Sequence, residues 1–574
     1  MNVIFKEVAS INRSMYLYYP PGANRTPFKR CSITVLRDED DEASVKRLLD
    51  DGLRELADKQ EIILSFPNPV GGRWNFDFSG KTNDMQAFIA FQDAMDKPDN
   101  KPVERLPNGI PTYESMVSTW HPMNDARYLI GIGSGADMVC TIAACAPDNI
   151  AGVLSIGGKL SKEALKNAVH AFMPISLVHS DQDTCDYFVK ANQAELTEQN
   201  DARTIYKNAA NPLQCVVDER NDNPYSSQLL QIVWDRMFSK TRRTNTGQHG
   251  DCEMRMDIKE AGFEIFIDDD RLDEEVKTPH TWFTHVPKSV KNNGVSKAPL
   301  LIFFHGGSDN PAEGADMSKF HELGEKEGFI TVYPWGTNKA QWNMVMESAQ
   351  TEGMCNADDV GFTVALIRYM CENYPVDPQR IYLSGFSNGA AQAMVVALTH
   401  PELIAAICPI DSNWPGNRVG PAEVNYDDIT PFRIAMELKQ KFDYLMPVWY
   451  TYGNREPSYP VYKGSSQQHQ YDFWKRYNHI EVVPTPEQDQ PHPCGCGVPG
   501  EKYELLTPSA RHPHHEYDVQ RFYTKDSAHL NLYNYVLMRD KGHDIAEMDP
   551  VLGWNYVKQF RRLSDGSLEI VQEG

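Results

Sequence analysis

Apolar runs of strand length alternate along this chain with short turns and amphipathic, helix-like stretches. The runs 32–36 and 300–304 are near-continuously hydrophobic, as expected of strands buried on both faces of a sheet. Helix-like stretches separate such runs in both halves of the chain. This alternation predicts an α/β fold, with a mostly parallel sheet covered by helices on both faces.

The order of these runs repeats once along the chain. Corresponding stretches are 32–36 and 301–304, 66–67 and 333–334, 74–75 and 342–343, 128–135 and 382–389, 173–175 and 446–448, and finally Trp234 and Trp554. The separation between partners changes only in steps, as insertions between ordered elements would produce. Two copies of one fold are therefore predicted in tandem.

The repeat defines the expected domains. We expect a first domain over residues 1–240, a polar linker over 241–255 and a second domain over 256–574. The second copy is longer between its strand near residue 448 and its last helix, so an insertion of about 459–533 is predicted there. This is a usual place for a cap over the substrate.

A Gly-x-Ser-x-Gly turn lies between a buried strand and a small-residue helix, at Gly385 to Gly389. In that context the pattern is typical of the nucleophile elbow of an α/β-hydrolase, and Ser387 is the predicted nucleophile. A serine needs a neighbouring base to become reactive, and in this fold the chain order is serine, acid, histidine.

The predicted base is His543, which lies in a Gly-His turn between the last apolar strand and the final helix. The predicted acid is Glu456, the carboxylate on the loop after the strand 447–451. The strand 300–304 leads directly into His305-Gly306-Gly307, so the backbone N–H of Gly307 or Gly306 and that of Asn388 are the expected oxyanion donors.

The first copy lacks this set. Gly133 stands where the second copy has Ser387, and Asn223 stands where it has His543. Arg37-Asp38-Glu39 replaces the histidine-glycine-glycine run, and Asp183 alone keeps the acid position of Glu456. The first domain is therefore expected to keep the fold without the chemistry, acting as a brace or an oligomer surface.

Charge and composition limit the partners. The chain has 56 basic and 79 acidic residues, a net charge of −23, which argues against nucleic acid or an anionic membrane. No stretch approaches the ~18 apolar residues of a membrane span. Met1 to Glu7 resembles no signal peptide, so we expect a cytoplasmic protein, with secretion possible if a leader was removed. The 11 cysteines are expected to be free thiols.

The runs 358–362, 374–382 and 385–390 are very similar to the polyhydroxybutyrate depolymerase-like esterases, a branch that includes feruloyl and acetylxylan esterases. His305-Gly306-Gly307 and Trp342-Asn343 fit the same family. The resemblance implies a serine carboxylesterase without cofactor, with an acyl-enzyme intermediate and with feruloyl, acetyl or hydroxyacyl esters as substrates. His305, Trp342 and the insertion's Trp474 are then candidate substrate-binding residues. The acid loop departs from the family pattern, because Tyr452-Gly453 and Glu456 replace a His-Gly with an Asp.

Other functions stay open from sequence alone. The same triad cleaves amides, so a serine peptidase is an alternative, as is a polyester hydrolase or a glycan- or partner-binding protein with vestigial activity. The insertion also contains His469, His492, Cys494, Cys496 and the run 512–516. Their spacing is irregular for structural zinc, so no metal is expected.

Overall fold

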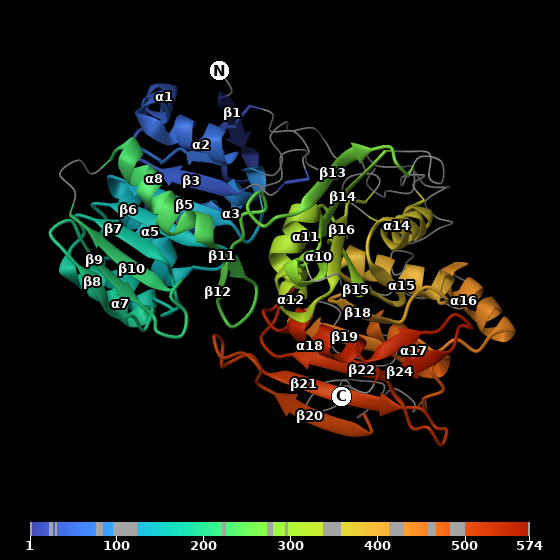
Figure 1. The fold of residues 1–574 in the computed structure, drawn as a ribbon. Coiled ribbons are helices and arrows are strands. Elements are labelled where there is room, and N and C mark those ends of the chain that lie inside the picture. Colours follow the sequence, from blue (N-terminus) through green and yellow to red (C-terminus); the bar gives the residue numbers. More distant parts are fainter. Residues whose placement is uncertain are drawn as a thin grey trace. The chain divides into compact units, whose positions relative to one another are not determined.

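The computed structural model describes residues 3–21, 27–28, 31–75, 84–95, 123–220, 225–272, 279–292, 297–336, 342, 358–412, 430–456, 466–482 and 500–571. The chain divides into two compact units, with the boundary between Asp257 and Ile258. Each unit contains one mixed sheet flanked by helices (Figure 1). The predicted α/β fold class, with two tandem domains, is confirmed.

The sheet of the first unit has ten described strands in the order β1-β2-β4-β3-β5-β6-β7-β10-β9-β8. The strands are β1 (Val3–Val8), β2 (Arg13–Tyr18), β3 (Ser32–Leu36), β4 (Ile63–Pro67), β5 (Arg127–Ile132), β6 (Gly152–Ile156), β7 (Ile175–Val178), β8 (Glu195–Gln199), β9 (Arg203–Lys207) and β10 (Cys215–Glu219). The helices are α1 (Glu42–Leu48), α2 (Arg54–Gln60), α3 (Asp84–Met95), α5 (Ser134–Cys145), α6 (Lys162–Asn167), α7 (Gln182–Ala191) and α8 (Ser227–Arg236).

The sheet of the second unit repeats this order as β13-β14-β16-β15-β17-β18-β19-β22-β21-β20. Its strands are β13 (Glu264–Asp269), β14 (His280–His285), β15 (Ala298–Phe304), β16 (Ile330–Pro334), β17 (Val376–Phe386), β18 (Ala406–Ile410), β19 (Val448–Gly453), β20 (Lys502–Leu506), β21 (Tyr517–Tyr523) and β22 (Asn531–Met538). Its helices are α10 (Lys288–Asn292), α11 (Pro311–Ser318), α12 (Phe320–Glu327), α14 (Asp359–Asn373), α15 (Asn388–Thr399), α16 (Thr430–Lys441), α17 (Ser466–Tyr477) and α18 (Asp549–Val557).

The two sheets share their pairing pattern as well as their strand order. In each, the six central strands run parallel and both edges are antiparallel, at β1-β2-β4 and β10-β9-β8 in the first unit. The second unit pairs in the same way. Identical topology over ten strands supports the internal repeat predicted from the sequence.

The apolar strands place side chains alternately on the two faces of the sheet, so each face needs a helical cover. In the first unit, Ile130 packs in a cluster with residues of α1, α2 and α8, whereas its neighbour Leu129 packs with α3, α5 and α7. The sheet is therefore buried on both faces, which explains why its central strands have near-continuous hydrophobic sequences.

The predicted linker, residues 241–255, is instead a buried hairpin of β11 (Thr241–Thr244) and β12 (Asp251–Met254). The hydroxyl of Tyr128 donates to the Thr241 carbonyl at 2.6 Å, and the Arg242 guanidinium lies 2.9 Å from Asp125. The second unit ends in the same way, in a hairpin of β23 (Phe560–Arg562) and β24 (Leu568–Ile570). There the Tyr382 hydroxyl donates to the Phe560 carbonyl. The hairpin is thus the last element of each repeat.

The predicted cap insertion is also corrected. Residues 459–533 contain α17, β20, β21 and the start of β22, which correspond to α7, β8, β9 and β10 of the first unit. The extra length lies in the loops between these elements, of which 457–465 and 483–499 fall outside the described residues. In its described residues the segment therefore extends the sheet, with the same elements that end the sheet of the first unit.

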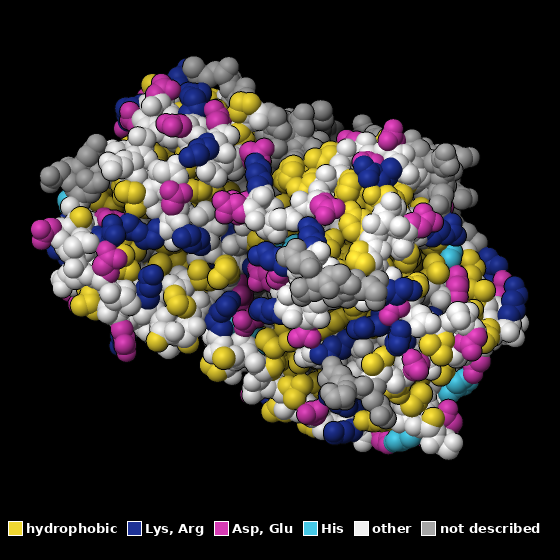
Figure 2. Space-filling model, viewed as in Figure 1, with side chains coloured by type: hydrophobic (Ala, Val, Ile, Leu, Met, Phe, Trp, Pro, Cys, Tyr) yellow, Lys and Arg dark blue, Asp and Glu magenta, His cyan; other side chains and the backbone are white. Residues whose placement is uncertain are grey.

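The structure also bears on three expectations from composition: membrane spans, free cysteines and surface charge. In the part of the chain that the structure describes, no helix combines the length and hydrophobicity that crossing a bilayer would require. The described cysteines are all free thiols. On the face drawn in Figure 2, acidic and basic side chains are interspersed.

Breaking the buried ion pair between Arg242 and Asp125 tests whether the hairpin 241–255 is part of the packed first unit. Their side chains are 2% and 9% exposed, so replacing Arg242 by Met leaves Asp125 as a buried charge without this partner. We expect Arg242→Met to lower the free energy of unfolding by about 3 kcal/mol or more in urea titrations followed by circular dichroism.

The control is Arg47→Met, which removes an exposed pair with Glu39 in the same unit. That change should cost at most about 1 kcal/mol. An equally small effect for Arg242→Met would mean that residues 241–255 behave as a linker.

Candidate active site

Ser387 lies at a strained corner between β17 and α15. Its backbone has φ 53° and ψ −116°, a combination that non-glycine residues rarely adopt. The Ser387 N–H donates to the carbonyl of Ile410 at 3.0 Å, which fixes the corner against the end of β18. In the first unit the corresponding Gly133 has nearly the same angles, φ 63° and ψ −133°. The corner thus belongs to the fold, and only the second copy carries a side chain there at a conformational cost.

The two glycines of the motif are required by close packing. A Cβ atom on Gly385 would lie 2.5 Å from the carbonyl group of Gly389, and a Cβ on Gly389 would lie 2.2 Å from the carbonyl oxygen of Phe304. The first turn of α15 is therefore in direct contact with the end of β15. This contact sets Ser387 beside the loop that begins at His305.

His543 and Glu456 form a close pair. The Nδ1 atom of His543 lies 2.6 Å from Oε1 of Glu456. The His543 side chain is 46% exposed, whereas that of Glu456 is 6% exposed. The His543 ring also packs on Phe386, the residue before Ser387, with ring centroids 4.7 Å apart. The fold therefore joins the predicted base to the predicted acid and packs the base on the residue that precedes the predicted nucleophile.

The electrostatic surroundings favour a protonated His543. Burial alone would lower the pKa of His543, but the hydrogen bond with Glu456 and the negative charges of Asp411 and Glu456 outweigh it. The pKa of His543 is consequently raised above its ordinary value of 6.5. An imidazole with this environment is well suited to accept a proton from a neighbouring hydroxyl.

A buried charge network beneath the pair was not predicted from the sequence. The Lys541 ammonium lies 3.0 Å from Asp411 and 2.6 Å from Asp549, and all three side chains are fully buried. Burial lowers the pKa of Lys541, but the two carboxylates outweigh this and raise it, so the lysine stays charged. Burial favours the neutral form of Asp411 and raises its pKa, whereas the Lys541 ammonium 3.0 Å away favours the carboxylate and opposes that rise.

Asp411 connects this network to the pair above it. One of its carboxylate oxygens lies within 4.8 Å of both Glu456 and the His543 ring. It follows β18 directly, at the position where the first unit has Gly157. A carboxylate at the end of a central strand in only one copy is the sequence signal that could have identified it.

Trp342 holds the loop 305–307, which carries two of the predicted oxyanion donors, against the start of α15. The Trp342 backbone N–H donates to Oδ1 of Asn388 at 2.6 Å, and its indole N–H donates to the His305 carbonyl at 2.9 Å. A Cβ on Gly306 would lie 2.9 Å from the Phe386 ring, so this glycine permits close approach to the elbow. The predicted donor Asn388, at the start of α15, thus belongs to a segment that contacts the loop of the other two, Gly306 and Gly307.

The three predicted substrate-binding residues are buried: His305 and Trp342 hold the loop after β15, and Trp474 packs in the hydrophobic core. His305 has Nδ1 2.6 Å from the Gly306 carbonyl, while Nε2 accepts from the Gly336 N–H at 3.1 Å. Burial lowers the pKa of His305 to about 4, which keeps the ring neutral in this arrangement. Trp342 is 1% exposed, and Trp474 is fully buried on α17 within the hydrophobic core.

The first unit fills the equivalent position with a carboxylate. Ser134, which corresponds to Asn388, donates from its backbone N–H to Oδ1 of Asp38 at 2.8 Å and from its hydroxyl at 2.5 Å. A Cβ on Gly133 would lie 2.2 Å from Oδ2 of Asp38. The Asp38 carboxylate thus accepts from the Ser134 N–H, the group that corresponds to the predicted oxyanion donor Asn388 of the second unit. The predicted counterpart of His543, Asn223, lies outside the described residues.

Comparison with known proteins agrees with this geometry. Residues 288–414 match the family model described as esterase PHB depolymerase. An acetylxylan esterase of Coprinopsis cinerea is 27% identical over 154 residues, 26% of this chain and 38% of that protein. Poly(3-hydroxyalkanoate) depolymerase C of Paucimonas lemoignei is 28% identical over 129 residues, 22% of this chain and 30% of the depolymerase.

Among solved structures, an acetyl xylan esterase from Aspergillus awamori is similar at 17% identity and a TM-score of 0.34, covering 51% of this chain and 98% of that one. The chain spans well under half the length of the two curated relatives named above. The residues matched by the family model include the loop 305–307 and the corner at Ser387. Residues 288–414 of this chain are therefore similar to the esterases described by the esterase PHB depolymerase model.

Proposed function

We propose that the second unit is a serine carboxylesterase in which Ser387, His543 and Glu456 form the catalytic triad. The observation that carries the proposal is the strained backbone of Ser387, whose neighbour Phe386 packs on a histidine with Nδ1 in contact with a buried carboxylate. The corner itself belongs to the fold, since Gly133 adopts it in the first unit, so a serine placed there at a conformational cost points to a function.

In the proposed reaction the Ser387 hydroxyl attacks the ester carbonyl carbon, and its proton passes to Nε2 of His543. Glu456 accepts the Nδ1–H hydrogen bond and stabilises the imidazolium that forms. The backbone N–H groups of Asn388 and of Gly307 or Gly306 bind the oxyanion. The C–O bond to the alcohol then breaks, and the alcohol leaves with the proton from His543. Water, activated by the same histidine, hydrolyses the acyl-enzyme.

The first unit is proposed to have no hydrolase activity of its own. The contact of Asp38 with the Ser134 N–H supports this, because a carboxylate in that position repels a second anion. Its proposed role is to support the fold of the whole chain or to provide a surface for homo-oligomers.

For the substrate, we propose acetyl or feruloyl esters of plant-derived carbohydrate. The support is the similarity to an acetylxylan esterase and to feruloyl esterase B of Talaromyces funiculosus, at 26% identity over 117 residues. A hydroxyalkanoate polyester is the second candidate, because the depolymerase of Paucimonas lemoignei has comparable identity.

Substitution of Ser387 tests the nucleophile. We expect Ser387→Ala to lower turnover of p-nitrophenyl acetate by about 10⁴-fold or more and to abolish labelling by a fluorophosphonate probe. Ser387→Gly should be equally inactive but more stable than Ser387→Ala, by about 1 kcal/mol in urea unfolding, because glycine tolerates φ 53° without strain.

The matched control is Ser134→Ala, at the elbow of the first unit, which should leave turnover unchanged. Undiminished turnover by Ser387→Ala would exclude the proposed mechanism. Equal stability of the alanine and glycine variants would show that the corner is not strained.

The pH dependence of kcat/KM tests Glu456 as the acid of the proposed triad. Protonated His543 cannot accept a proton, so kcat/KM should fall as the pH drops below the raised pKa of His543. The Glu456 charge favours the imidazolium, and its removal lowers that pKa. Glu456→Gln should therefore shift the acid limb of the kcat/KM profile to lower pH and reduce the maximum by about 10²-fold or more.

A control is Glu504→Gln, which changes a half-buried carboxylate paired with Arg521 on β21 and should leave the profile in place. An acid limb that stays fixed or moves to higher pH in Glu456→Gln would exclude Glu456 as the partner of the base.

A substrate panel tests the substrate class. Hydrolysis of methyl ferulate, acetylated xylan, hydroxybutyrate oligomers and a peptide p-nitroanilide is measured side by side. We expect the feruloyl or acetyl ester to have a kcat/KM at least about tenfold above the others, a difference of ~1.4 kcal/mol in transition-state binding. Faster hydrolysis of the oligomers would favour a polyester hydrolase, and faster hydrolysis of the anilide would favour a peptidase. Uniformly negligible rates would favour a binding protein.

A further inference from the structure

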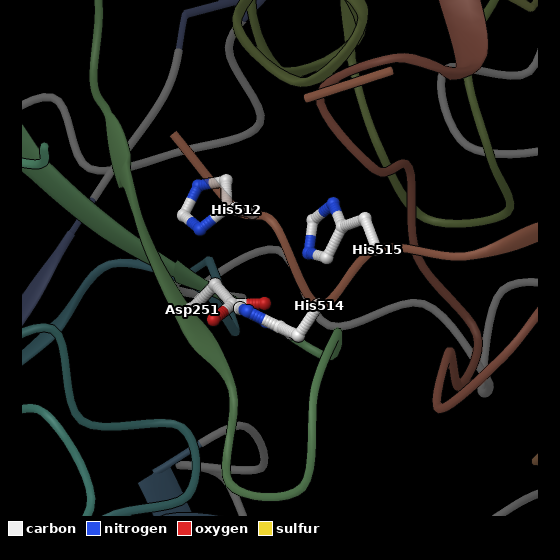
Figure 3. A group of neighbouring side chains, drawn as sticks. All are labelled: Asp251, His512, His514 and His515. Atoms are coloured by element: carbon white, nitrogen blue, oxygen red, sulfur yellow. The ribbon is translucent and has the colours of Figure 1, made fainter. Parts of the chain in front are cut away.

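Three histidines gather on the loop between β20 and β21 of the second unit. The backbone N–H of His515 donates to the carbonyl of His512 at 2.9 Å, which closes a turn with Pro513 and His514 inside it. One ring nitrogen from each of His512, His514 and His515 lies within 4.8 Å of those of the other two (Figure 3). Asp251, which the figure also labels, belongs to the first unit.

We propose that His512, His514 and His515 bind a transition-metal ion, with Zn²⁺ as the ion whose chemistry fits them best. Imidazole nitrogens are borderline ligands that suit Zn²⁺, Cu²⁺ and Ni²⁺, whereas Ca²⁺ and Mg²⁺ take oxygen ligands. Three histidine ligands leave the fourth tetrahedral position for water or another group. This site lies outside the proposed triad and does not depend on the proposed esterase activity.

The geometry requires only a small adjustment. Zn–N bonds of about 2.1 Å place tetrahedral ligand atoms about 3.4 Å apart, so ring nitrogens within 4.8 Å need to close by little more than an ångström. The rings of His512 and His515 have centroids 4.7 Å apart, and those of His514 and His515 are 4.8 Å apart. Rotation about side-chain bonds on one short turn is sufficient for this movement.

Charge and access favour a cation at this turn. A carboxylate oxygen of Glu547 lies within 4.8 Å of a ring nitrogen of His512. Glu547 accepts a hydrogen bond from the Ser509 hydroxyl, and its carboxylate lies 3.6 Å from Arg511, so it is held beside the turn. His512 and His515 are buried, whereas His514 is exposed and gives an ion a route from solvent.

The sequence spacing had argued against zinc, because His512-Pro513-His514-His515 lacks the regular ligand intervals of structural sites. The turn overcomes this irregularity by bringing its first and last residues together. Cys494, Cys496 and His492, which the same argument included, lie outside the described residues.

Calorimetric titration of the metal-free full chain with ZnCl₂ tests the proposal. We expect Zn²⁺ to bind at this site with a dissociation constant in the micromolar range or below. The double variant His512→Ala with His515→Ala should bind at least about 100-fold more weakly, because loss of even one outer-shell partner of a ligand costs about 10- to 100-fold. The matched control changes His479 and His529 to Ala, since these exposed histidines pair with Asp443 and Glu501. That control should bind as the wild type does.

A variant with Cys494 and Cys496 changed to Ser identifies the ligands. Retained Zn²⁺ affinity supports the histidine site, whereas lost affinity would assign the ion to the cysteines and overturn the proposal. Unchanged affinity in the His512 and His515 double variant, or no binding by the wild type, would also overturn it. Unchanged circular dichroism and fluorophosphonate labelling of each variant show that it is folded.

Discussion

The contact between the start of α15 and the end of β15 is the constraint on which the proposed site depends. Gly389 has no Cβ, and a Cβ there would lie 2.2 Å from the Phe304 carbonyl oxygen, so only glycine allows the helix to begin this close to the strand. The closeness forces the sharp corner at Ser387 and sets it beside Gly306. The first unit has the same contact between Gly135 and Leu36, again at 2.2 Å. The corner is therefore a property of the fold, and the residue placed on it decides the chemistry.

Comparison of the two units distinguishes the residues that the fold requires from those that the proposed chemistry requires. Both keep the order of ten strands, the corner and the closing hairpin, because these serve the packing of the sheet. They differ where an ester would react. Asp38 places a carboxylate on the backbone N–H of Ser134, whereas the second unit has a histidine-glycine-glycine run at the corresponding position. The Asp38 side chain satisfies the Ser134 N–H and thereby stabilises the corner, which supports the proposal that the first unit has no hydrolase activity.

Charge is arranged in two layers around His543. Glu456 contacts the ring directly, and Asp411 lies within 4.8 Å of the same ring, beside the buried ammonium of Lys541. Lys541 in turn contacts Asp549 at the start of α18, next to the loop that carries His543. A buried charge is costly unless it is paired, so this network fixes the loop while it holds negative charge near the imidazole. Position and pKa of His543 are thus set by the same residues.

The sequence by itself determined the repeat, the α/β class and the elbow, because strand periodicity and the glycine pattern are local properties of consecutive residues. Chain order then pointed to Glu456 and His543, whose side chains meet at 2.6 Å in the structure. Only the tertiary structure decided that 241–255 is a buried hairpin, that Trp474 packs in the core, and that Asp411 and Lys541 lie beneath the histidine. Each of these depends on a contact between residues far apart in the chain. Burial and ion pairing arise from such contacts, and neither can be read from neighbours in the sequence.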